Sequence, residues 1–207
     1  MSELAALTAA IDRGDRDTAT GLVRAAIDEG RDPNEILGAM TAAMDLVGRK
    51  FQDGIYFVPE MLISARAMKA GTELLEPVLV AAGMRPAHTA VIGTVRGDLH
   101  DIGKNLVRMM WKGANVAVVD LGTDVPPERF VAAAREHGAS VVGVSALLTT
   151  TMPAMRAVVE AVHGELPGTK VLVGGAPLDA DYAAEIGADG YARDAGAAVD
   201  VIRAALA

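Results

Sequence analysis

The sequence contains no cysteine, and this absence excludes disulfide bonds, zinc sites built from thiolates and catalysis by a thiol. It also lacks an excess of positive charge, because 19 lysine and arginine residues face 27 aspartate and glutamate residues and give a net charge of −8. A chain of this charge repels phosphate backbones, so nucleic acid is not an expected partner. Aromatic residues make up only 3% of the chain, whereas alanine, valine, leucine and methionine are plentiful.

Long apolar runs are missing as well. No apolar segment approaches the ~20 residues that are needed to span a bilayer. The first residues, MSELAALTAAIDRGDRD, have neither the basic start nor the apolar stretch of a signal peptide. We therefore expect a soluble protein of the cytoplasm with no membrane partner. With 207 residues, of which 51% are hydrophobic, the chain can bury a core in one large domain or in two small ones.

The first part of the chain, residues 2–83, carries apolar side chains at helical spacing and no convincing strand. Four helices are predicted there. The second starts near Asp17 or Thr18, and the third starts at Asp32-Pro33, where an N-cap precedes proline at the first helical position. The fourth opens at Val58. Four helices with short connections predict a small bundle.

After residue 86 the pattern changes, and short β-branched runs alternate with amphipathic helices. Such runs are typical of parallel strands that helices cover on both faces. They occupy residues 90–95, 116–121, 140–145, 170–174 and 190–192. We therefore predict two domains: a helical bundle over residues 1–86, and over residues 87–207 a flavodoxin-like (Rossmann-type) α/β domain. Its five-stranded parallel sheet should have the order 2-1-3-4-5.

The polar loops of the second domain follow the predicted strands. They comprise residues 94–105 after the first strand, 145–152 after the third and 174–177 after the fourth. In an open α/β sheet of this order, ligands bind beyond the C-terminal ends of the first and third strands. These loops are therefore where we expect the functional site.

His100 is the residue of these loops that most needs an explanation. It follows Asp98 by two positions, so one ring nitrogen can bind a metal while the other donates its hydrogen to the carboxylate. The pattern alone also fits a plain surface loop. His88, His137 and His163 do not complete a conventional zinc or iron site, and the last two are typical of helix C-termini. A single histidine suffices only for a metal that brings its own equatorial ligands, which points to heme or a corrinoid.

At this loop the sequence resembles a known family. The segment Gly97-Asp98-Leu99-His100-Asp101-Ile102-Gly103-Lys104-Asn105 matches the Asp-x-His-x-x-Gly motif of cobalamin-binding proteins. Ser145-x-Leu147 and Gly174-Gly175 match the two later signatures of that family. The chain resembles the small corrinoid proteins of methanogens and acetogens and the cobalamin-binding region of methionine synthase. The resemblance covers nearly the whole chain, because these proteins also carry an N-terminal four-helix bundle.

The resemblance implies that the cofactor is cobalamin and that His100 is the lower axial ligand of its cobalt. Asp98 would be the hydrogen-bond partner of His100, and Thr151 would replace the serine that comes third in the methionine synthase pattern. In the helical cap, Phe51 and Val58 match the pair that covers the methyl-bearing face. The cofactor contacts implied in the α/β domain are Gly97, Asp98, Leu99, His100, Asp101, Ile102, Gly103, Ser145, Leu147, Thr149, Gly174, Gly175 and Ala195.

The implied function is that of a corrinoid protein that carries a methyl group on cobalt between two enzymes. These partners would be a donor-specific methyltransferase and an acceptor methyltransferase that serves tetrahydrofolate or a thiol, with a reductive activase as a third. The chain would then be one component of a methyltransferase and not a complete enzyme. The sequence does not disclose the methyl donor.

Three alternatives are the small subunit of an adenosylcobalamin-dependent mutase, a cobalamin-based sensor, and a response-regulator-like domain without a corrinoid. The helical cap before residue 86 argues against the mutase, and the lack of a basic recognition helix argues against a DNA-binding sensor. A response regulator would need a phosphoacceptor aspartate after the third strand, and none is present there.

Overall fold

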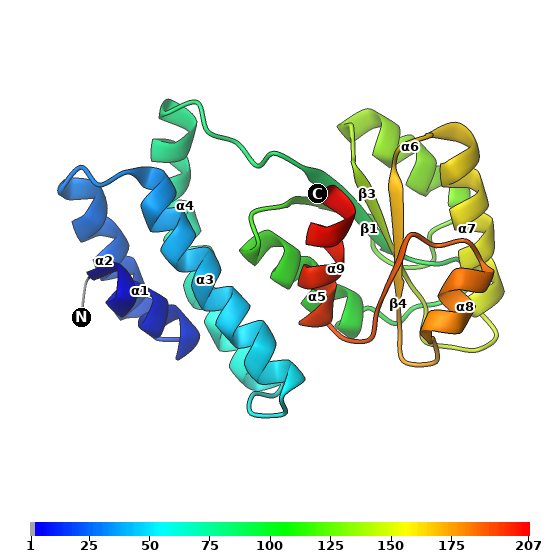
Figure 1. Cartoon of the computed structure of the whole chain (residues 1–207), viewed down its shortest axis with the longest axis horizontal. Helices are drawn as coiled ribbons and strands as arrows, with labels where there is room; N and C mark the ends of the chain where they lie inside the picture. The colour runs from blue at the N-terminus through cyan, green and yellow to red at the C-terminus, as the bar shows by residue number, and fades with distance from the viewer. Residues whose placement is uncertain (1–2) are drawn as a thin grey trace. The chain divides into compact units, whose positions relative to one another are not determined.

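A computed structural model describes residues 3–207, and in it the chain divides into two compact units (Figure 1). The first unit consists of the chain up to Pro86 together with a short second segment, Gly113–Asn115. The second comprises Ala87–Lys112 and Val116–Ala207. No helix within residues 3–207 has both the length and the apolar character that crossing a membrane requires.

The first unit is helical, as predicted. Between Glu3 and Ala81 the chain forms α1 (Glu3–Asp12), α2 (Arg16–Asp28), α3 (Pro33–Gln52) and α4 (Val58–Ala81). The apolar side chains at helical spacing are buried between these helices, and the largest of them are Leu7, Ile11, Val23, Ile36, Met40, Met44, Met61 and Leu75. Their burial stabilises the bundle, because each such side chain gains about 1.5–3 kcal/mol when it leaves water.

The predicted start of the third helix is confirmed, and that of the second is wrong by two or three residues. The Asp32 side chain accepts a hydrogen bond from the backbone of Asn34, and Pro33 follows as the first helical residue. The N-cap of α2 is Asp15, whose carboxylate accepts from the backbone of Thr18 at 3.1 Å. Asp17 and Thr18, the predicted starting residues, lie inside the first turn.

A polar cluster fixes the connection between α3 and α4. The Lys50 ammonium contacts both carboxylate oxygens of Asp12, at 2.6 and 2.8 Å, and the Tyr56 hydroxyl at 3.2 Å. The buried Ser64 hydroxyl donates to the backbone oxygen of Asp12 at 2.8 Å. The cluster therefore joins the end of α1 to the connection and to α4.

The second unit contains a sheet of five parallel strands, as predicted. They are β1 (Thr89–Thr94), β2 (Ala117–Asp120), β3 (Val141–Ser145), β4 (Lys170–Gly174) and β5 (Gly190–Ala192). The order is β2-β1-β3-β4-β5, so the predicted topology is confirmed. The helices between and after the strands are α5 (Ile102–Gly113), α6 (Pro127–His137), α7 (Met152–Glu165), α8 (Ala180–Glu185) and α9 (Ala197–Leu206).

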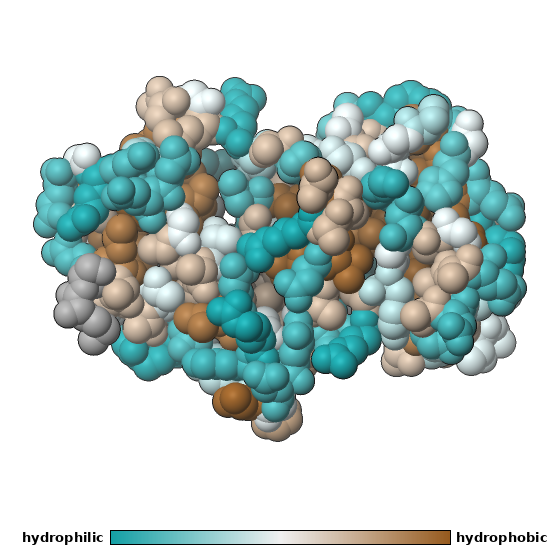
Figure 2. Space-filling view, viewed as in Figure 1, coloured by the Kyte–Doolittle hydropathy of each residue, from teal (hydrophilic) through white to brown (hydrophobic). Residues whose placement is uncertain are grey.

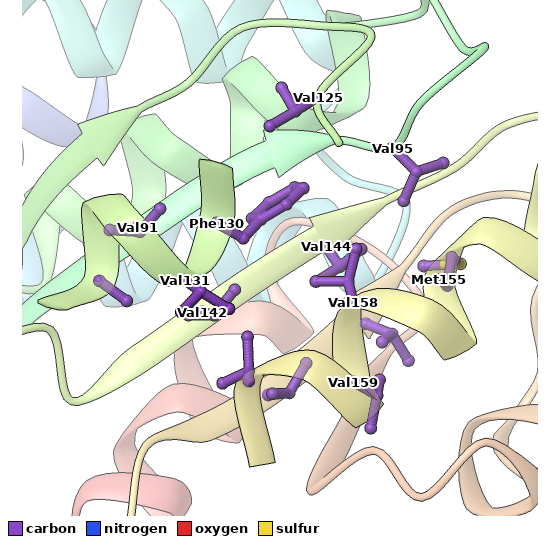
Figure 3. Packing of buried hydrophobic residues seen from close by; sticks show 14 of the residues in the cluster. Val91, Val95, Val125, Phe130, Val131, Val142, Val144, Met155, Val158 and Val159 are labelled. Carbon is purple, nitrogen blue, oxygen red and sulfur yellow. The ribbon is translucent and has the colours of Figure 1, made fainter. Parts of the chain in front are cut away.

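Helices cover both faces of this sheet, which explains why the strands read as continuous apolar runs. On one face, α6, α7 and α8 pack over a cluster that includes Val91, Val142 and Phe130 (Figure 3). On the other face, α5 and α9 pack over a second cluster that includes Ile92 and Trp111. Neighbouring strand residues thus point to opposite faces, as the pleat requires.

Two glycines in the central strands make room for the two buried aromatic side chains of this core. A Cβ atom at Gly93 of β1 would lie 2.8 Å from the ring of Phe130. At Gly143 of β3 it would lie 2.6 Å from the ring of Trp111, on the other face. The Trp111 indole also donates to the backbone oxygen of Ala198 at 2.9 Å, so its position is fixed. The close packing of α5 and α6 on the sheet depends on these missing side chains.

The Gly143→Ala substitution should therefore lower the free energy of unfolding by about 1–3 kcal/mol, because the added methyl group overfills a packed core. Urea denaturation followed by circular dichroism measures the change. Gly164→Ala is the matched control: a Cβ at this position in α7 meets no atom within 4 Å. That substitution should leave stability unchanged or raise it by up to about 1 kcal/mol. Equal stabilities of the two variants would contradict the packing argument.

Candidate functional site

The candidate site lies at the C-terminal edge of the sheet, where the chain leaves β1 and β3. Thr94, the last residue of β1, pairs in register with Ser145 of β3, which in turn pairs with Gly174 of β4. The loops after these strands therefore start side by side. The loop after β1 carries Asp98 and His100, and the structure brings it against the loop after β3.

The Asp98 carboxylate is the centre of this contact, and it is completely buried. One oxygen, Oδ1, accepts from the backbone N–H of His100 at 3.0 Å and lies 2.8 Å from its ring nitrogen Nδ1. The other, Oδ2, accepts from the backbone of Leu147 at 2.7 Å and of Leu148 at 3.3 Å. The Thr151 hydroxyl lies 2.8 Å from the same oxygen. The carboxylate thus joins both loops.

These contacts keep Asp98 ionised. Burial by itself disfavours the charged form and raises the pKa of a carboxyl group. Here the hydrogen bonds from the Leu147 and His100 backbone, the Thr151 hydroxyl and the His100 ring outweigh burial, and they hold the pKa of Asp98 well below its usual range. At neutral pH the group is therefore a carboxylate, which can only accept hydrogen bonds.

The charge of Asp98 determines which nitrogen of His100 carries hydrogen. Because Asp98 only accepts, Nδ1 must be protonated, and in the neutral ring the lone pair is then on Nε2. The side chain is 51% exposed, and no residue within 3–207 forms a hydrogen bond with Nε2. The buried Thr94 hydroxyl donates to the backbone oxygen of His100 at 2.9 Å. Asp98 and Thr94 thus hold His100 in place, and the free lone pair of Nε2 faces outward.

The Thr151 hydroxyl has two acceptors and one proton. Its oxygen lies 2.8 Å from Asp98 Oδ2 and 2.9 Å from the backbone oxygen of Leu148. It can donate to only one of them at a time, and the charged carboxylate is the stronger acceptor. Thr151 is therefore the third member of a hydrogen-bonded series that starts at the His100 ring.

Apolar side chains surround the exposed imidazole. Leu99 and Ile102 flank His100 in the sequence and are 74% and 73% exposed. Leu147 and Leu148 from the loop after β3 are also exposed. The family motif predicts the first three of these side chains as cofactor contacts, but it does not predict Leu148. Exposed aliphatic side chains that gather in one place are typical of a surface that binds an apolar partner, so this rim fits a ligand with an apolar face.

The glycines of the site differ in how much space a side chain would find there. Gly175 has φ +145, and a Cβ atom there would lie 1.8 Å from the backbone oxygen of Ala146, so only glycine fits. A Cβ at Gly174 would lie 3.0 Å from the backbone oxygen of Ala192. Gly103 faces open space, because no protein atom lies within 4 Å of a Cβ built there. Gly174 and Gly175 thus bring neighbouring backbones close together, and Gly103 leaves room at the start of α5.

The other predicted contacts are distributed around this centre. Thr149 is exposed, and Ser145 is half-buried. The exposed Asp101 accepts from the side chain of Asn105 at 2.9 Å, and Ala195 is buried. Gly97 has φ +83 and donates its N–H to a carboxylate oxygen of Asp124 at 2.7 Å, a partner that sequence reasoning missed.

Phe51 and Val58 lie in the helical unit and are both half-buried there. Ile55 and Phe57 between them are more exposed, and Figure 2 shows hydrophobic surface at this tip between α3 and α4. The family pattern predicts contacts only at Phe51 and Val58, so it does not predict the exposure of Ile55 and Phe57.

Within residues 3–207 no cluster of three or more histidine, cysteine, aspartate or glutamate side chains could hold a metal ion. A metal at His100 would therefore need most of its ligands from elsewhere. The donor set and its surroundings, one imidazole in an apolar rim, fit a metal that is held in a macrocycle.

Comparisons with known proteins decide between the two candidate macrocycles, heme and a corrinoid. A family model described as a B12 binding domain matches residues 88–200, and a second model with the same description matches residues 3–76. The chain belongs to the B12-binding family. This membership covers both units, since one model spans most of the helical unit and the other spans most of the α/β unit.

Relatives in the B12-binding family match over most of their length. A corrinoid protein of Desulfitobacterium hafniense is 42% identical over 97% of this chain and 96% of its own. Dimethylamine corrinoid protein 1 of Methanosarcina acetivorans is 42% identical over 89% of this chain and 90% of its own. Among solved structures, the methanol:cobalamin methyltransferase complex of Methanosarcina barkeri matches with a TM-score of 0.85 and 31% identity. The match covers 98% of this chain and 79% of the matched one.

The substitution Asp98→Asn should lower the free energy of unfolding at pH 7 by about 1–3 kcal/mol, because an amide cannot accept from all these donors at once. The pKa of Asp98 is lowered on folding, so its charge stabilises the fold above the unfolded-state pKa of about 4. This contribution is lost as the pH falls below that value towards the pKa in the folded protein. The difference between wild type and variant should thus be constant from pH 7 to 5 and shrink in stronger acid.

Urea denaturation across this pH range measures both effects. The control is Asp101→Asn, an exposed position three residues away, which should change stability by less than about 0.5 kcal/mol. If Asp98→Asn behaved like Asp101→Asn, the buried carboxylate would not have the role that its contacts assign to it.

Proposed function

We propose that this chain is a corrinoid protein that carries a methyl group on cobalt, with His100 as the lower axial ligand. The observation that carries the proposal is the His100 imidazole, whose Nε2 lone pair faces outward among exposed apolar side chains while a buried carboxylate holds Nδ1. Membership of the B12-binding family and the similarity to methylamine and methanol corrinoid systems support the same function. They do not favour a mutase subunit or a sensor.

In this proposal the bound corrinoid would supply a cobalt that accepts and gives up a methyl group. The protein would bind the metal, fix the tautomer of its ligand and exclude water. His100 would hold the metal through the lone pair of Nε2. Asp98 accepts the hydrogen of Nδ1, which fixes the tautomer and makes Nε2 a better donor. Leu99, Ile102, Leu147 and Leu148 would lie against the apolar underside of the ring and keep water away.

Asp98 and Thr151 would also adjust how strongly His100 binds. With His100 as a metal ligand, the negative carboxylate would stabilise partial positive charge on the ring. If His100 were released from the metal, Nε2 would be free to bind a proton, and Asp98 would hold the resulting imidazolium in an ion pair. Thr151 shares its proton with the carboxylate and so sets how basic the carboxylate is. The binding and release of His100 would therefore be coupled to the uptake of a proton.

The expected partners are a donor-side methyltransferase, an acceptor-side methyltransferase for tetrahydrofolate or a thiol, and a reductive activase. What supports the first is the similarity to the Methanosarcina barkeri complex, which is a methanol:cobalamin methyltransferase. The helical unit, with Phe51 and Val58, would cover the methyl-bearing face and exclude water from it. The location in the cytoplasm stays a prediction.

The first test compares how the purified protein and two histidine variants bind hydroxocobalamin. Wild type should form a coloured complex with the absorption spectrum of histidine-ligated cobalamin. In His100→Gln this spectrum should be lost, and the affinity should fall by at least about tenfold, the effect of losing one charge-assisted or coordinate contact. His137→Gln, at an exposed histidine in the last turn of α6, should behave as wild type. An unchanged spectrum in His100→Gln would rule out the proposed ligand.

The second test measures methyl transfer to the bound corrinoid. The reduced complex is mixed with methanol or a methylamine and the methyltransferase encoded nearest to this chain, and the visible spectrum is followed. Methylation should occur with one donor–enzyme pair and slow down in Asp98→Asn. A complex that binds cobalamin but gives the products of a mutase or responds only to light would assign the chain to one of the alternatives.

A further inference from the structure

The loop between β2 and α6, residues 121–126, contains a residue in an unusual backbone conformation. Asp124 has φ +55, and within residues 3–207 the only other non-glycine residue with positive φ is Asn115, at +63. Side chains clash with the backbone in this left-handed region, although aspartate and asparagine tolerate it better than most. A residue that keeps such a conformation is held there by its surroundings.

The contacts of Asp124 are with the loop that carries His100. Its carboxylate oxygen Oδ1 accepts the N–H of Gly97 at 2.7 Å. Its own N–H donates to the backbone oxygen of Asp98 at 3.0 Å. Gly97 is also in the left-handed region, with φ +83. Asp124 therefore binds both sides of the turn that leads from β1 to His100.

The neighbours of Asp124 fasten the same two segments. The N–H of Thr94 donates to the oxygen of Gly122 at 3.0 Å, and the N–H of Val125 donates back to the oxygen of Thr94 at 3.0 Å. Val95 and Val125 form a parallel bridge. Thr94 in turn donates its hydroxyl to the backbone of His100. The β2–α6 loop thus runs alongside the first residues of the His100 loop, and backbone hydrogen bonds join the two.

An ion pair between the buried Lys104 and Asp120 connects the residues after His100 with the end of β2. The ammonium of Lys104, in the first turn of α5, lies 2.6 Å from Asp120 Oδ1 and is buried. The same oxygen accepts the N–H of Gly122 at 3.0 Å. Asp120 directly precedes the β2–α6 loop and Lys104 lies four residues after His100, so the end of β2 is also tied to the residues that follow His100.

We propose that the β2–α6 loop is a template that sets the conformation of the His100 loop, and that Asp124 is its positioning residue. Asp124 acts through Gly97 and Asp98. If their peptide rotates, the Asp98 carboxylate moves away from the N–H of Leu147 and no longer accepts from the ring of His100. The inference rests on the proposed function only where it concerns cobalamin, and its first test needs no ligand.

Three variants separate the side-chain bond from the backbone conformation. Asp124→Gly keeps the left-handed backbone and removes the acceptor, whereas Asp124→Asn keeps an acceptor oxygen and tolerates the same φ. Asn115→Gly is the matched control, since it changes the other left-handed residue, which lies before β2. Thermal unfolding should show that all three fold.

The first measurement is hydrogen exchange of the Gly97 amide in the ligand-free protein by NMR. Exchange should be about tenfold faster in Asp124→Gly, the order expected when a hydrogen bond to a charged group is lost. It should be close to wild type in Asp124→Asn and unchanged in Asn115→Gly. Unchanged exchange in Asp124→Gly would overturn the proposal.

The second measurement is the dissociation constant for hydroxocobalamin and the spectrum of the complex. Asp124→Gly should bind about tenfold more weakly and show less of the histidine-ligated form, with Asp124→Asn restoring both. Wild-type binding and spectrum in Asp124→Gly would show that the loop does not position the ligand, and the proposal would fail. If wild type itself did not bind cobalamin, the proposed function would fail, and the exchange rates alone would decide whether Asp124 fixes the loop.

Discussion

The candidate site depends on one buried negative charge. The Asp98 carboxylate has left water completely, which costs several kcal/mol unless its oxygens are satisfied. The donors that satisfy it come from two segments about fifty residues apart, the loop after β1 and the loop after β3. The same charge fixes the tautomer of His100. The buried Asp98 carboxylate therefore determines how the two loops pack together. It also determines that Nε2 of His100 carries the free lone pair.

The sheet makes this interaction possible. Strands β1 and β3 are neighbours because the chain crosses to β2 at the edge and then returns past β1. Their loops consequently start next to each other, and the helices that follow them, α5 and α7, pack on opposite faces of the sheet. Gly93 and Gly143 let α6 and α5 approach the two central strands closely, so the strand ends that carry the site are rigidly supported.

Much of this was predictable from the sequence, because periodicity and turn residues determine strands and helices locally. The strands from Lys170 and Gly190 have the predicted bounds, and the others differ by one residue at one or both ends. The proximity of Asp98, His100 and Thr151 was implied by the family motif. The parts that could not be predicted are made by the backbone: Leu148 contributes an N–H to Asp98, and Asp124 acts from a left-handed conformation. Neither leaves a pattern of side-chain types that sequence reasoning could detect.

The packing of Trp111 against Gly143 has a practical consequence. Trp111 is the single tryptophan of the chain and lies in the core of the α/β unit, with its indole bonded to α9. The helical unit contains no indole, so emission excited at the red edge of protein absorbance reports on the α/β unit alone. The chain thus carries an intrinsic fluorophore with which the melting of its two halves can be told apart.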